Sequence, residues 1–235
     1  MPRFHERTLA LLGSEGVRQQ RSVEVLLDWA AHNSIHLPAA FLEWAKVDDG
    51  TLIQKYSNDD WFWFDDPKLV VTLDGVRGLL FNRENQGNFD RIVCLDQGDD
   101  PPVLFAWIGR PPWVRNTERF SDAIYAEVFD WQYWLEFKPD DPVYKEITYY
   151  GELNFKTDDC LVVLRKRYEE TVKTSFVTDD TRYVEYRFIR SPVLRLTVLV
   201  SGDGSTNIRI TGRPVEAVKA LEEELKSLLG ASTAQ

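Results

Sequence analysis

The feature that most constrains the fold is a series of short apolar runs between residues 51 and 108, separated by residues that favour turns. The runs have the length and composition of β-strands: TLIQKYS, WFWF, KLVVTL, RGLLFN, FDRIVCLD and PVLFAWI. Asp74-Gly75, between the third run and the fourth, is a tight-turn signal. FDRIVCLD and PVLFAWI carry apolar residues on both faces, which is typical of central strands covered on both sides. This segment therefore predicts a mainly antiparallel sheet.

Helical periodicity precedes and follows these strands. The segment SVEVLLDWAAHNSI places its apolar residues on one helical face, with Ser22 available as N-cap. Pro38 opens a second helix over PAAFLEWAKVDDG, because proline is tolerated at the first helical position, and the Asp-Asp-Gly turn ends it. After the strands, FSDAIYAEVFDWQYWLEF returns to helical spacing. Helices and strands in separate runs indicate an α+β architecture.

A boundary is expected near KPDDPVYK, residues 138–145, where two prolines and two aspartates resist regular structure. All eight tryptophans precede residue 135, so the composition changes at the same place. We therefore predict one domain over residues 1–138 and a smaller C-terminal α+β domain or extension over residues 145–235.

The C-terminal part predicts a helix from about Asp158 to Lys173, then the strands TRYVEYRFI, VLRLTVLV and NIRIT. Pro214 begins a last helix over VEAVKALEEELKSLL. The glycine-rich SGDGST joins the last two strands and is interpreted as a hairpin turn. It lacks the G-x-x-x-x-G-K-[ST] pattern and precedes a strand, whereas a phosphate loop precedes a helix.

Composition limits the classes of partner. The net charge is −10 and the pI is about 4.9, and residues 1–138 alone hold 22 acidic and 14 basic residues, a net charge of −8. This balance argues against binding nucleic acid directly and allows a basic protein partner. No apolar run is long enough for a membrane span, and the N-terminus does not resemble a signal peptide. Cys94 and Cys160 lie in apolar patterns as two reduced core thiols. We expect a cytoplasmic protein.

Candidate catalytic groups are few. His5, His32 and His36 are the only histidines, and all precede the strands. His32 and His36 have the i,i+4 spacing of metal ligands, but Asn33 replaces the glutamate of H-E-x-x-H and Pro38 indicates that the helix ends between them. No catalytic, metal or cofactor site is predicted.

Asp-Asp pairs occur seven times, at 48/49, 59/60, 65/66, 99/100, 140/141, 158/159 and 179/180. A metal-dependent enzyme would need three or more of these carboxylates to converge. Most of the pairs flank Gly or Pro or precede a helix, positions that aspartate favours because its side chain caps backbone N–H groups. We interpret them as turn residues that could together steer a basic protein toward an acidic face.

The tryptophans are interpreted mainly as core residues. Trp29, Trp44, Trp131 and Trp134 lie on helical patterns, whereas Trp61, Trp63, Trp107 and Trp113 lie in strands or in the proline-rich loop RPPWVRN. Exposed aromatic side chains are enriched at protein interfaces, which makes Trp113 an interface candidate.

Several segments occur in an order that resembles the SUKH superfamily, which includes the Smi/Knr-type cell-wall-assembly regulator domain and many bacterial immunity proteins. In chain order they are LPAAFLEWAKVDDG, LLFNRENQG, FDRIVCLD, GDDPPVLFAW and RFSDAIY, between residues 37 and 125. The resemblance covers about residues 22–137 and leaves residues 145–235 outside it. It implies an α+β domain with a curved, mainly antiparallel sheet flanked by helices, and a role in binding instead of catalysis.

The resemblance further implies a bacterial immunity protein, an antitoxin that binds and neutralises a cognate polymorphic toxin. The acidic loops and exposed aromatics would then contact the toxin, and the predicted contact residues are Asp59, Asp60, Trp61, Glu84, Asp99, Asp100 and Trp113. The alternative is a regulatory scaffold of the Smi/Knr type that binds a host protein or a small ligand. The sequence leaves the toxin, the oligomeric state and the role of residues 145–235 open.

Overall fold

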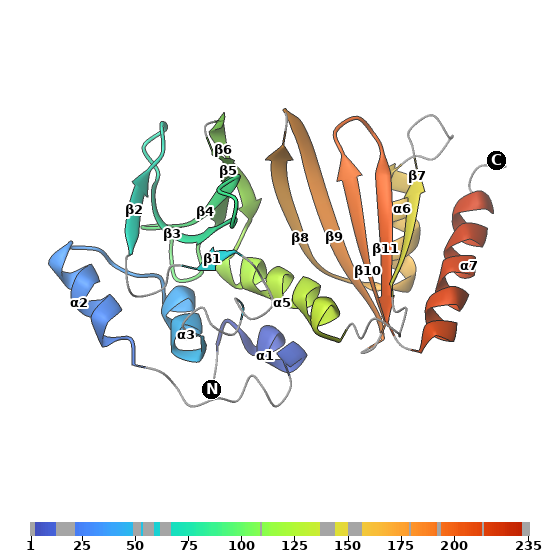
Figure 1. The fold of residues 1–235 in the computed structure, drawn as a ribbon, viewed down its shortest axis with the longest axis horizontal. Coiled ribbons are helices and arrows are strands. Elements are labelled where there is room, and N and C mark those ends of the chain that lie inside the picture. Colours follow the sequence, from blue (N-terminus) through green and yellow to red (C-terminus); the bar gives the residue numbers. More distant parts are fainter. Residues whose placement is uncertain are drawn as a thin grey trace. The chain divides into compact units, whose positions relative to one another are not determined.

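The computed structural model describes residues 3–12, 22–48, 53, 59–61, 67–108, 110–136, 144–149, 157–178, 180–191, 194–212 and 214–231. The chain divides into two compact units, Met1–Leu135 and Glu136–Gln235. Each unit combines helices with a curved, open antiparallel sheet, so the α+β class predicted from the sequence is confirmed (Figure 1). Within the described ranges, no helix is long and apolar enough to cross a bilayer.

The first unit contains these described elements in chain order: α1 (Glu6–Leu12), α2 (Glu24–His32), α3 (Ala39–Val47), β1 (Asp60–Trp61), β2 (Lys68–Val71), β3 (Arg77–Arg83), β4 (Phe89–Cys94), β5 (Val103–Trp107), β6 (Arg110–Thr117) and α5 (Phe120–Glu136). The strand order in the sheet is β1-β3-β4-β5-β6, and β2 also pairs with β3. Every pairing is antiparallel. Between β2 and β3 the N–H of Thr72 donates to the carbonyl of Val76 over 2.9 Å and Gly75 has a φ of +83°, which confirms the tight turn at Asp74-Gly75.

One face of this sheet packs against helices. Leu79 on β3, Val93 on β4 and Val103 on β5 are cross-strand neighbours and point to the same side. They join the main core with the large side chains of α3 and α5, among them Phe41, Trp44 and Phe120, each fully buried. Figure 1 shows α1, α3 and α5 on this side of the strands. A smaller cluster on the opposite face contains Leu80, Ile92, Cys94 and Leu104.

Several local expectations in the first unit need correction. RPPWVRN, expected to be a loop, belongs to strand β6. Because β6 is an edge strand of the sheet, the missing N–H groups of its two prolines interrupt no hydrogen bonds between central strands.

The helices before the sheet also differ in detail from the expectation. Leu27, expected on the buried face of α2, is 44% exposed. Pro38 occupies the N-cap position just before α3, and α2 ends at His32, which confirms that the helix stops before His36. Of TLIQKYS only Ile53 is described, and it is helical.

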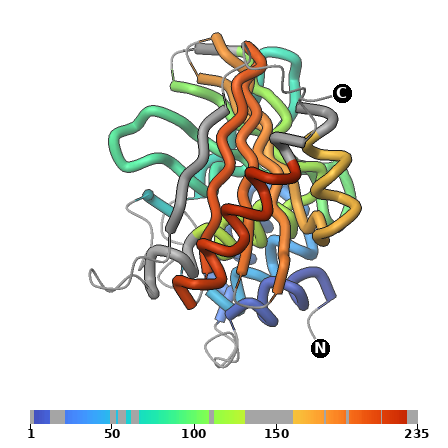
Figure 2. Tube along the Cα trace, turned by 90° about the vertical axis from the view of Figure 1, so that its right-hand side faces the viewer, coloured from blue at the N-terminus to red at the C-terminus, as the bar shows by residue number. Residues whose placement is uncertain are grey.

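The second unit contains β7 (Tyr144–Tyr149), α6 (Thr157–Arg167), β8 (Glu169–Thr178), β9 (Thr181–Ser191), β10 (Leu194–Ser201), β11 (Thr206–Gly212) and α7 (Val215–Ala231). The strand order is β7-β11-β10-β9-β8, with all pairs antiparallel. In Figure 2 the C-terminal helix α7 runs along the sheet, and it contacts β11 and β7. SGDGST forms the hairpin turn between β10 and β11, as predicted, with Gly204 at a φ of +87°.

The core of the second unit lies between its sheet and its two helices. Leu196 and Val198 on β10 and Ile208 and Ile210 on β11 are buried with residues of α6 and α7. The helix expected to reach Lys173 ends at Arg167 instead, and strand β8 begins at Glu169. The burial pattern explains the strand. Val172 and Thr174 are buried while Lys173 between them is exposed, and this alternation of every second residue is that of a β-strand. Most of the expected boundary segment KPDDPVYK lies outside the described residues, although β7 begins within it at Tyr144.

Candidate functional site

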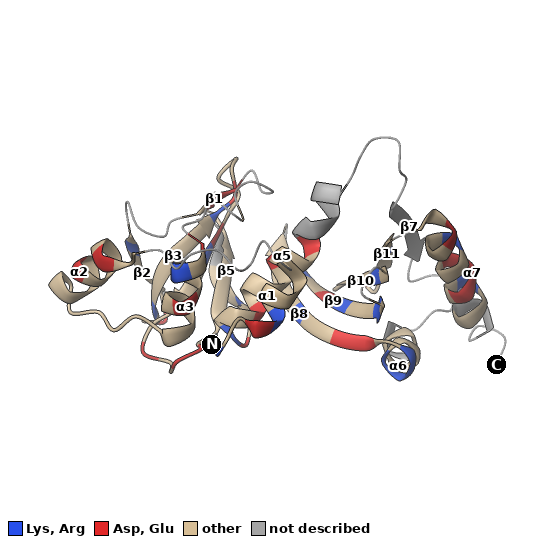
Figure 3. Ribbon diagram, turned by 90° about the horizontal axis from the view of Figure 1, so that it is seen from below, with Lys and Arg blue, Asp and Glu red and all other residues tan. Residues whose placement is uncertain are grey.

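The predicted acidic contact residues and Trp61 divide between two opposite ends of the first sheet, whereas Trp113 lies within the edge strand β6. Strand β1, with Asp60 and Trp61, pairs with the last residues of β3, and Glu84 begins the turn that follows β3. Asp99 and Asp100 follow the other end of β4. The structure therefore brings the first group together and keeps the second apart from it. Figure 3 shows both acidic and basic residues on α1 and on α7.

Glu84 organises the turn between β3 and β4. Its carboxylate oxygen Oε2 accepts the backbone N–H groups of Gln86 over 3.0 Å and Asn88 over 3.1 Å. Its backbone carbonyl accepts the N–H of Gly87 over 2.7 Å. This is the capping role that the sequence predicts for turn carboxylates.

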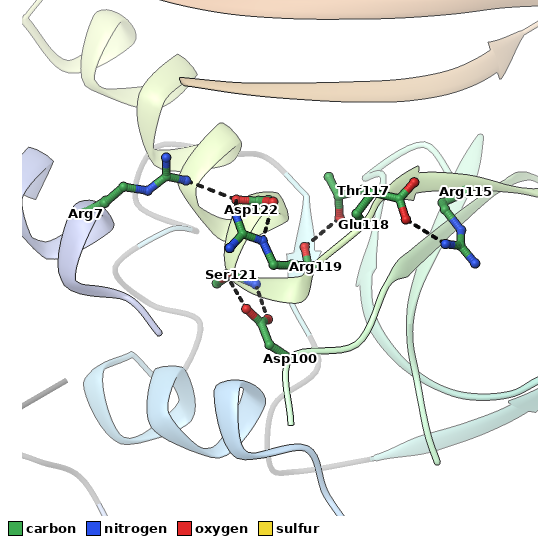
Figure 4. A network of polar contacts seen from close by, with 8 residues as sticks. All are labelled: Arg7, Asp100, Arg115, Thr117, Glu118, Arg119, Ser121 and Asp122. Carbon is green, nitrogen blue, oxygen red and sulfur yellow. Dashed lines mark hydrogen bonds and ion pairs between the residues drawn. The ribbon is translucent and has the colours of Figure 1, made fainter. Parts of the chain in front are cut away.

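Asp99 and Asp100 cap two different helices. The backbone carbonyl of Asp99 accepts the N–H of Ala40, in the first turn of α3, over 2.8 Å, and its carboxylate lies 3.7 Å from the Arg3 guanidinium. The carboxylate of Asp100 accepts both the backbone N–H and the hydroxyl of Ser121 at the start of α5 (Figure 4). Both aspartates therefore hold helices in place, and their roles fit the turn interpretation.

Ion pairs surround the start of α5. Arg119 binds Asp122 through two hydrogen bonds of 2.9 and 3.0 Å, and Arg7 of α1 donates to the same carboxylate over 3.0 Å (Figure 4). Arg115 pairs with Glu118 over 2.6 Å nearby. Asp122 and Glu118 at this end of the sheet are thus paired with arginines of the same unit.

The N-terminal segment is anchored by Glu43 of α3. The backbone N–H groups of Arg3, Phe4 and His5 all donate to its carboxylate, over 2.8, 2.8 and 2.9 Å. Partial burial is the largest single effect and raises the pKa of Glu43. The three hydrogen bonds together outweigh it, so the pKa is lowered overall. His5 is fully buried, and its Nε2 donates to the carbonyl of Ala40 over 2.9 Å. Burial lowers the pKa of His5, so the imidazole is held in its neutral form.

At the other end of the sheet, Asp59 lies in a partly buried polar cluster. Asn82 of β3 is fully buried, and its amide nitrogen Nδ2 lies 3.4 Å from Asp59 Oδ2 and 3.5 Å from the backbone carbonyl of Asp60. Arg91, the neighbour of Asn82 on β4, forms an ion pair with Glu127 of α5. We refer to Asp59, Asn82, Arg91 and Glu127 as the Asp59 cluster.

The electrostatics of this cluster disfavour the charge of Asp59. Burial raises the pKa of Asp59 most, and the carboxylates of Glu127 and Glu84 raise it further. The guanidinium of Arg91 and the amide of Asn82 act in the opposite direction and do not fully compensate. Asp59 is nevertheless partly exposed and Asp60 is exposed, so the cluster borders solvent.

The two aromatic contact candidates have different environments. Trp61 is 8% exposed and its ring packs against Phe81 at a centroid distance of 5.9 Å, so it belongs to the core. Trp113 is partly buried and packs against the smaller cluster, on the face of the sheet opposite the main core. Trp113 is therefore the more accessible of the two.

Sequence reasoning missed Asn82, Arg91 and Glu127. The only available signal was their polar character within otherwise apolar patterns, in RGLLFN, FDRIVCLD and the helix of residues 120–136.

Among the described residues, no three or more His, Cys, Asp or Glu side chains converge as a metal site would require. Cys94 and Cys160 are free and buried, as predicted.

Comparison with known proteins does not assign the chain to a family: no protein-family model matches it, and no curated protein matches it. The resemblance to the SUKH superfamily thus stays a prediction from the residues between 22 and 137.

Proposed function

We propose that the protein is a non-catalytic binding protein of the immunity type, which binds and neutralises a cognate toxin through the acidic end of its first sheet. The observation that carries the proposal is the gathering of Asp59, Asp60 and Glu84, from separate segments, around the end of β3. Glu127 of α5 adds a further carboxylate there, and burial, together with the charges of Glu127 and Glu84, raises the pKa of Asp59. A surface of this charge attracts a partner with a basic surface and speeds its association.

Two further observations support this function. The order of motifs resembles a family rich in immunity proteins, and residues 1–138 have a net charge of −8. Toxins of such systems are often nucleases or other nucleic-acid-active enzymes with basic surfaces, so an acidic inhibitor would occlude the surface that the toxin uses to bind its substrate. The protein would then act in the cytoplasm, where the toxin acts.

Co-expression with the polymorphic toxin encoded beside this gene tests the proposal. We expect the full chain to restore growth and to co-purify with the toxin, with an affinity that falls as salt rises. Absence of both protection and complex would overturn the function.

A matched pair of double variants locates the surface. Asp59→Asn with Asp60→Asn should weaken the complex, whereas Asp96→Asn with Glu118→Gln, which changes the net charge equally, should not. Asp96 and Glu118 pair with Arg77 and Arg115 on the surface, and such pairs contribute little to stability. Equal affinity of both double variants would overturn the assignment of the surface.

A further inference from the structure

Strand β2 lies at an edge of the first sheet, where it pairs with β3 alone among the described strands (Figure 1). Leu69 and Val71 of β2 are exposed by 46% and 62%, and Leu73, in the turn that follows, by 91%. Because Leu69 and Val71 are two positions apart, their side chains point to the same face of the sheet. An exposed apolar strand at a sheet edge is a template for pairing with another chain.

The backbone groups of Leu69 and Val71 point away from β3. The N–H of Thr72 donates to the carbonyl of Val76, so Thr72 faces β3. In an antiparallel pair the hydrogen-bonded residues alternate along the strand, and therefore Val70 also faces β3 while Leu69 and Val71 face outward. Within the described part of the chain, neither of these two residues has a hydrogen bond outside the β2–β3 pair. Both residues thus present a donor and an acceptor along the edge.

We propose that β2 is a self-association surface, at which two copies of the chain pair their β2 strands antiparallel about a two-fold axis at Val70. An axis perpendicular to the sheet at Val70 sets Leu69 of one copy opposite Val71 of the other. Because both residues face outward, each such pair exchanges two hydrogen bonds, and every outward group of the two residues is used. The first sheets of the two copies then form one continuous sheet.

The ends of the strand select this register. An axis at Leu69 would set Val71 opposite Pro67, which has no N–H group to donate. An axis at Val71 would set Leu69 opposite Leu73, which belongs to the turn before β3. With the axis at Val70, the hydrogen-bonded pairs consist of strand residues alone.

The side chains are complementary in the same register. On one face, Leu69 and Val71 of the two copies lie next to one another and cover apolar surface that is exposed in a single copy. On the other face, Lys68 lies opposite Thr72, whose hydroxyl donates to the Asp74 carboxylate over 2.5 Å. The end of each strand with a positive charge therefore meets the turn of the other copy with a negative charge, and the two lysines stay apart. This self-complementarity identifies a second copy as the partner.

The inference does not rest on the proposed function. Strand β2 pairs with residues 77–80 of β3, whereas Asp60 and Trp61 of β1 pair with residues 82 and 83. Self-association and toxin binding therefore use different residues, and either can fail without the other.

Sedimentation velocity of the full chain over a range of concentrations tests the surface. We expect a reversible dimer that is weak because the interface is small, and that becomes populated as the concentration rises toward about 1 mM. Val71→Lys adds a charge at the edge and should weaken the dimer at least about tenfold. Val25→Lys makes the same change at a valine of α2 that is 66% exposed, and it should dimerise like wild type. A wild-type monomer at every concentration, or equal dissociation constants for the two variants, would overturn the proposal.

Cysteine variants test the axis. In the proposed register Val70 meets Val70 of the other copy in a non-hydrogen-bonded pair, with Cα atoms about 4.5 Å apart, a distance that a disulfide can span. Val71 lies opposite Leu69, so the two copies of Val71 are diagonal neighbours about 7–8 Å apart. With a mild oxidant, Val70→Cys should form a covalent dimer and Val71→Cys should not, although Val71 is the more exposed residue. Faster cross-linking of Val71→Cys, or none of Val70→Cys, would contradict the two-fold pairing.

Discussion

The carboxylate of Asp100 holds Ser121 by two hydrogen bonds, 2.9 Å from its backbone N–H and 2.6 Å from its hydroxyl. The two residues are 21 positions apart in the chain. A loop aspartate between β4 and β5 thereby satisfies an N–H group at the start of α5 that has no partner within the helix. The neighbouring Asp99 caps α3 through its backbone carbonyl, so the β4–β5 loop joins two helices to the sheet.

Replacement of Asp100 should therefore be costly, whereas replacement of Asp99 should not. Asp100→Ala removes a helix cap and should lower the free energy of unfolding by about 1–2 kcal/mol. Asp99→Ala keeps the carbonyl that caps α3 and loses only an exposed ion pair with Arg3, so its effect should stay within about 0.5 kcal/mol. Urea denaturation of both variants measures the difference. Similar losses in the two variants would contradict the capping role.

The buried imidazole of His5 predicts a loss of stability in mild acid. Burial lowers the pKa of His5 from its ordinary value of 6.5. Below about pH 6.5 the unfolded chain therefore binds a proton that the folded chain does not, so the free energy of unfolding decreases as the pH falls. The slope for one such group is at most about 1.4 kcal/mol per pH unit. The effect should appear between about pH 7 and about pH 5, above the range in which carboxylates titrate.

His5→Gln tests this assignment, because its side-chain amide can still donate to the Ala40 carbonyl but does not titrate. We expect its stability to be less dependent on pH over that range than that of wild type. His32→Gln, at an exposed histidine of α2, should keep the wild-type slope. A slope unchanged in His5→Gln would show that another group is responsible.

Gly78 and Ile92 are predicted to be coupled in stability. A Cβ atom at Gly78 would lie 2.5 Å from Ile92 Cδ1 and 2.9 Å from Ile92 Cγ1, too close for either atom to remain in place. Gly78→Ala should therefore destabilise the first unit by about 1–3 kcal/mol. Ile92→Val removes Cδ1, so the double variant should be more stable than the sum of the single effects. A double-mutant cycle that shows strict additivity would exclude the clash.

Both cysteines should be unreactive in the folded protein. Burial raises the pKa of Cys94 to about 11 and that of Cys160 to about 12. Because the thiolate is the reactive form, an aromatic disulfide reagent at about pH 8 should modify neither thiol in the native state. In denaturant it should modify both. Rapid modification of one thiol in the native protein would place that cysteine in an accessible site.

Local patterns in the sequence were sufficient for much of the fold. The strands β2 to β5 and β9 to β11, the turn at Asp74-Gly75 and the helix after Pro214 follow from periodicity and turn chemistry, which act between near neighbours. Strand β6 was missed because its prolines suggest a loop, and only its place at the edge of the sheet makes a strand acceptable. The helix expected to reach Lys173 was too long because tertiary burial of Val172 and Thr174 favours the strand there.

The candidate site depended on tertiary structure to a greater degree. From the sequence, Asp99 and Asp100 were equivalent to Asp59 and Asp60 as acidic turn residues. In the structure the first pair caps helices, while the second pair lies beside Asn82. The sequence by itself determined the α+β class, the turns and the acidic balance, because these depend on composition and local spacing. Only the tertiary structure decided which carboxylates meet. Strands β1 and β4 pair with β3, and α5 packs against the sheet. These contacts bring together four separate segments, which contain Asp59, Asn82, Arg91 and Glu127.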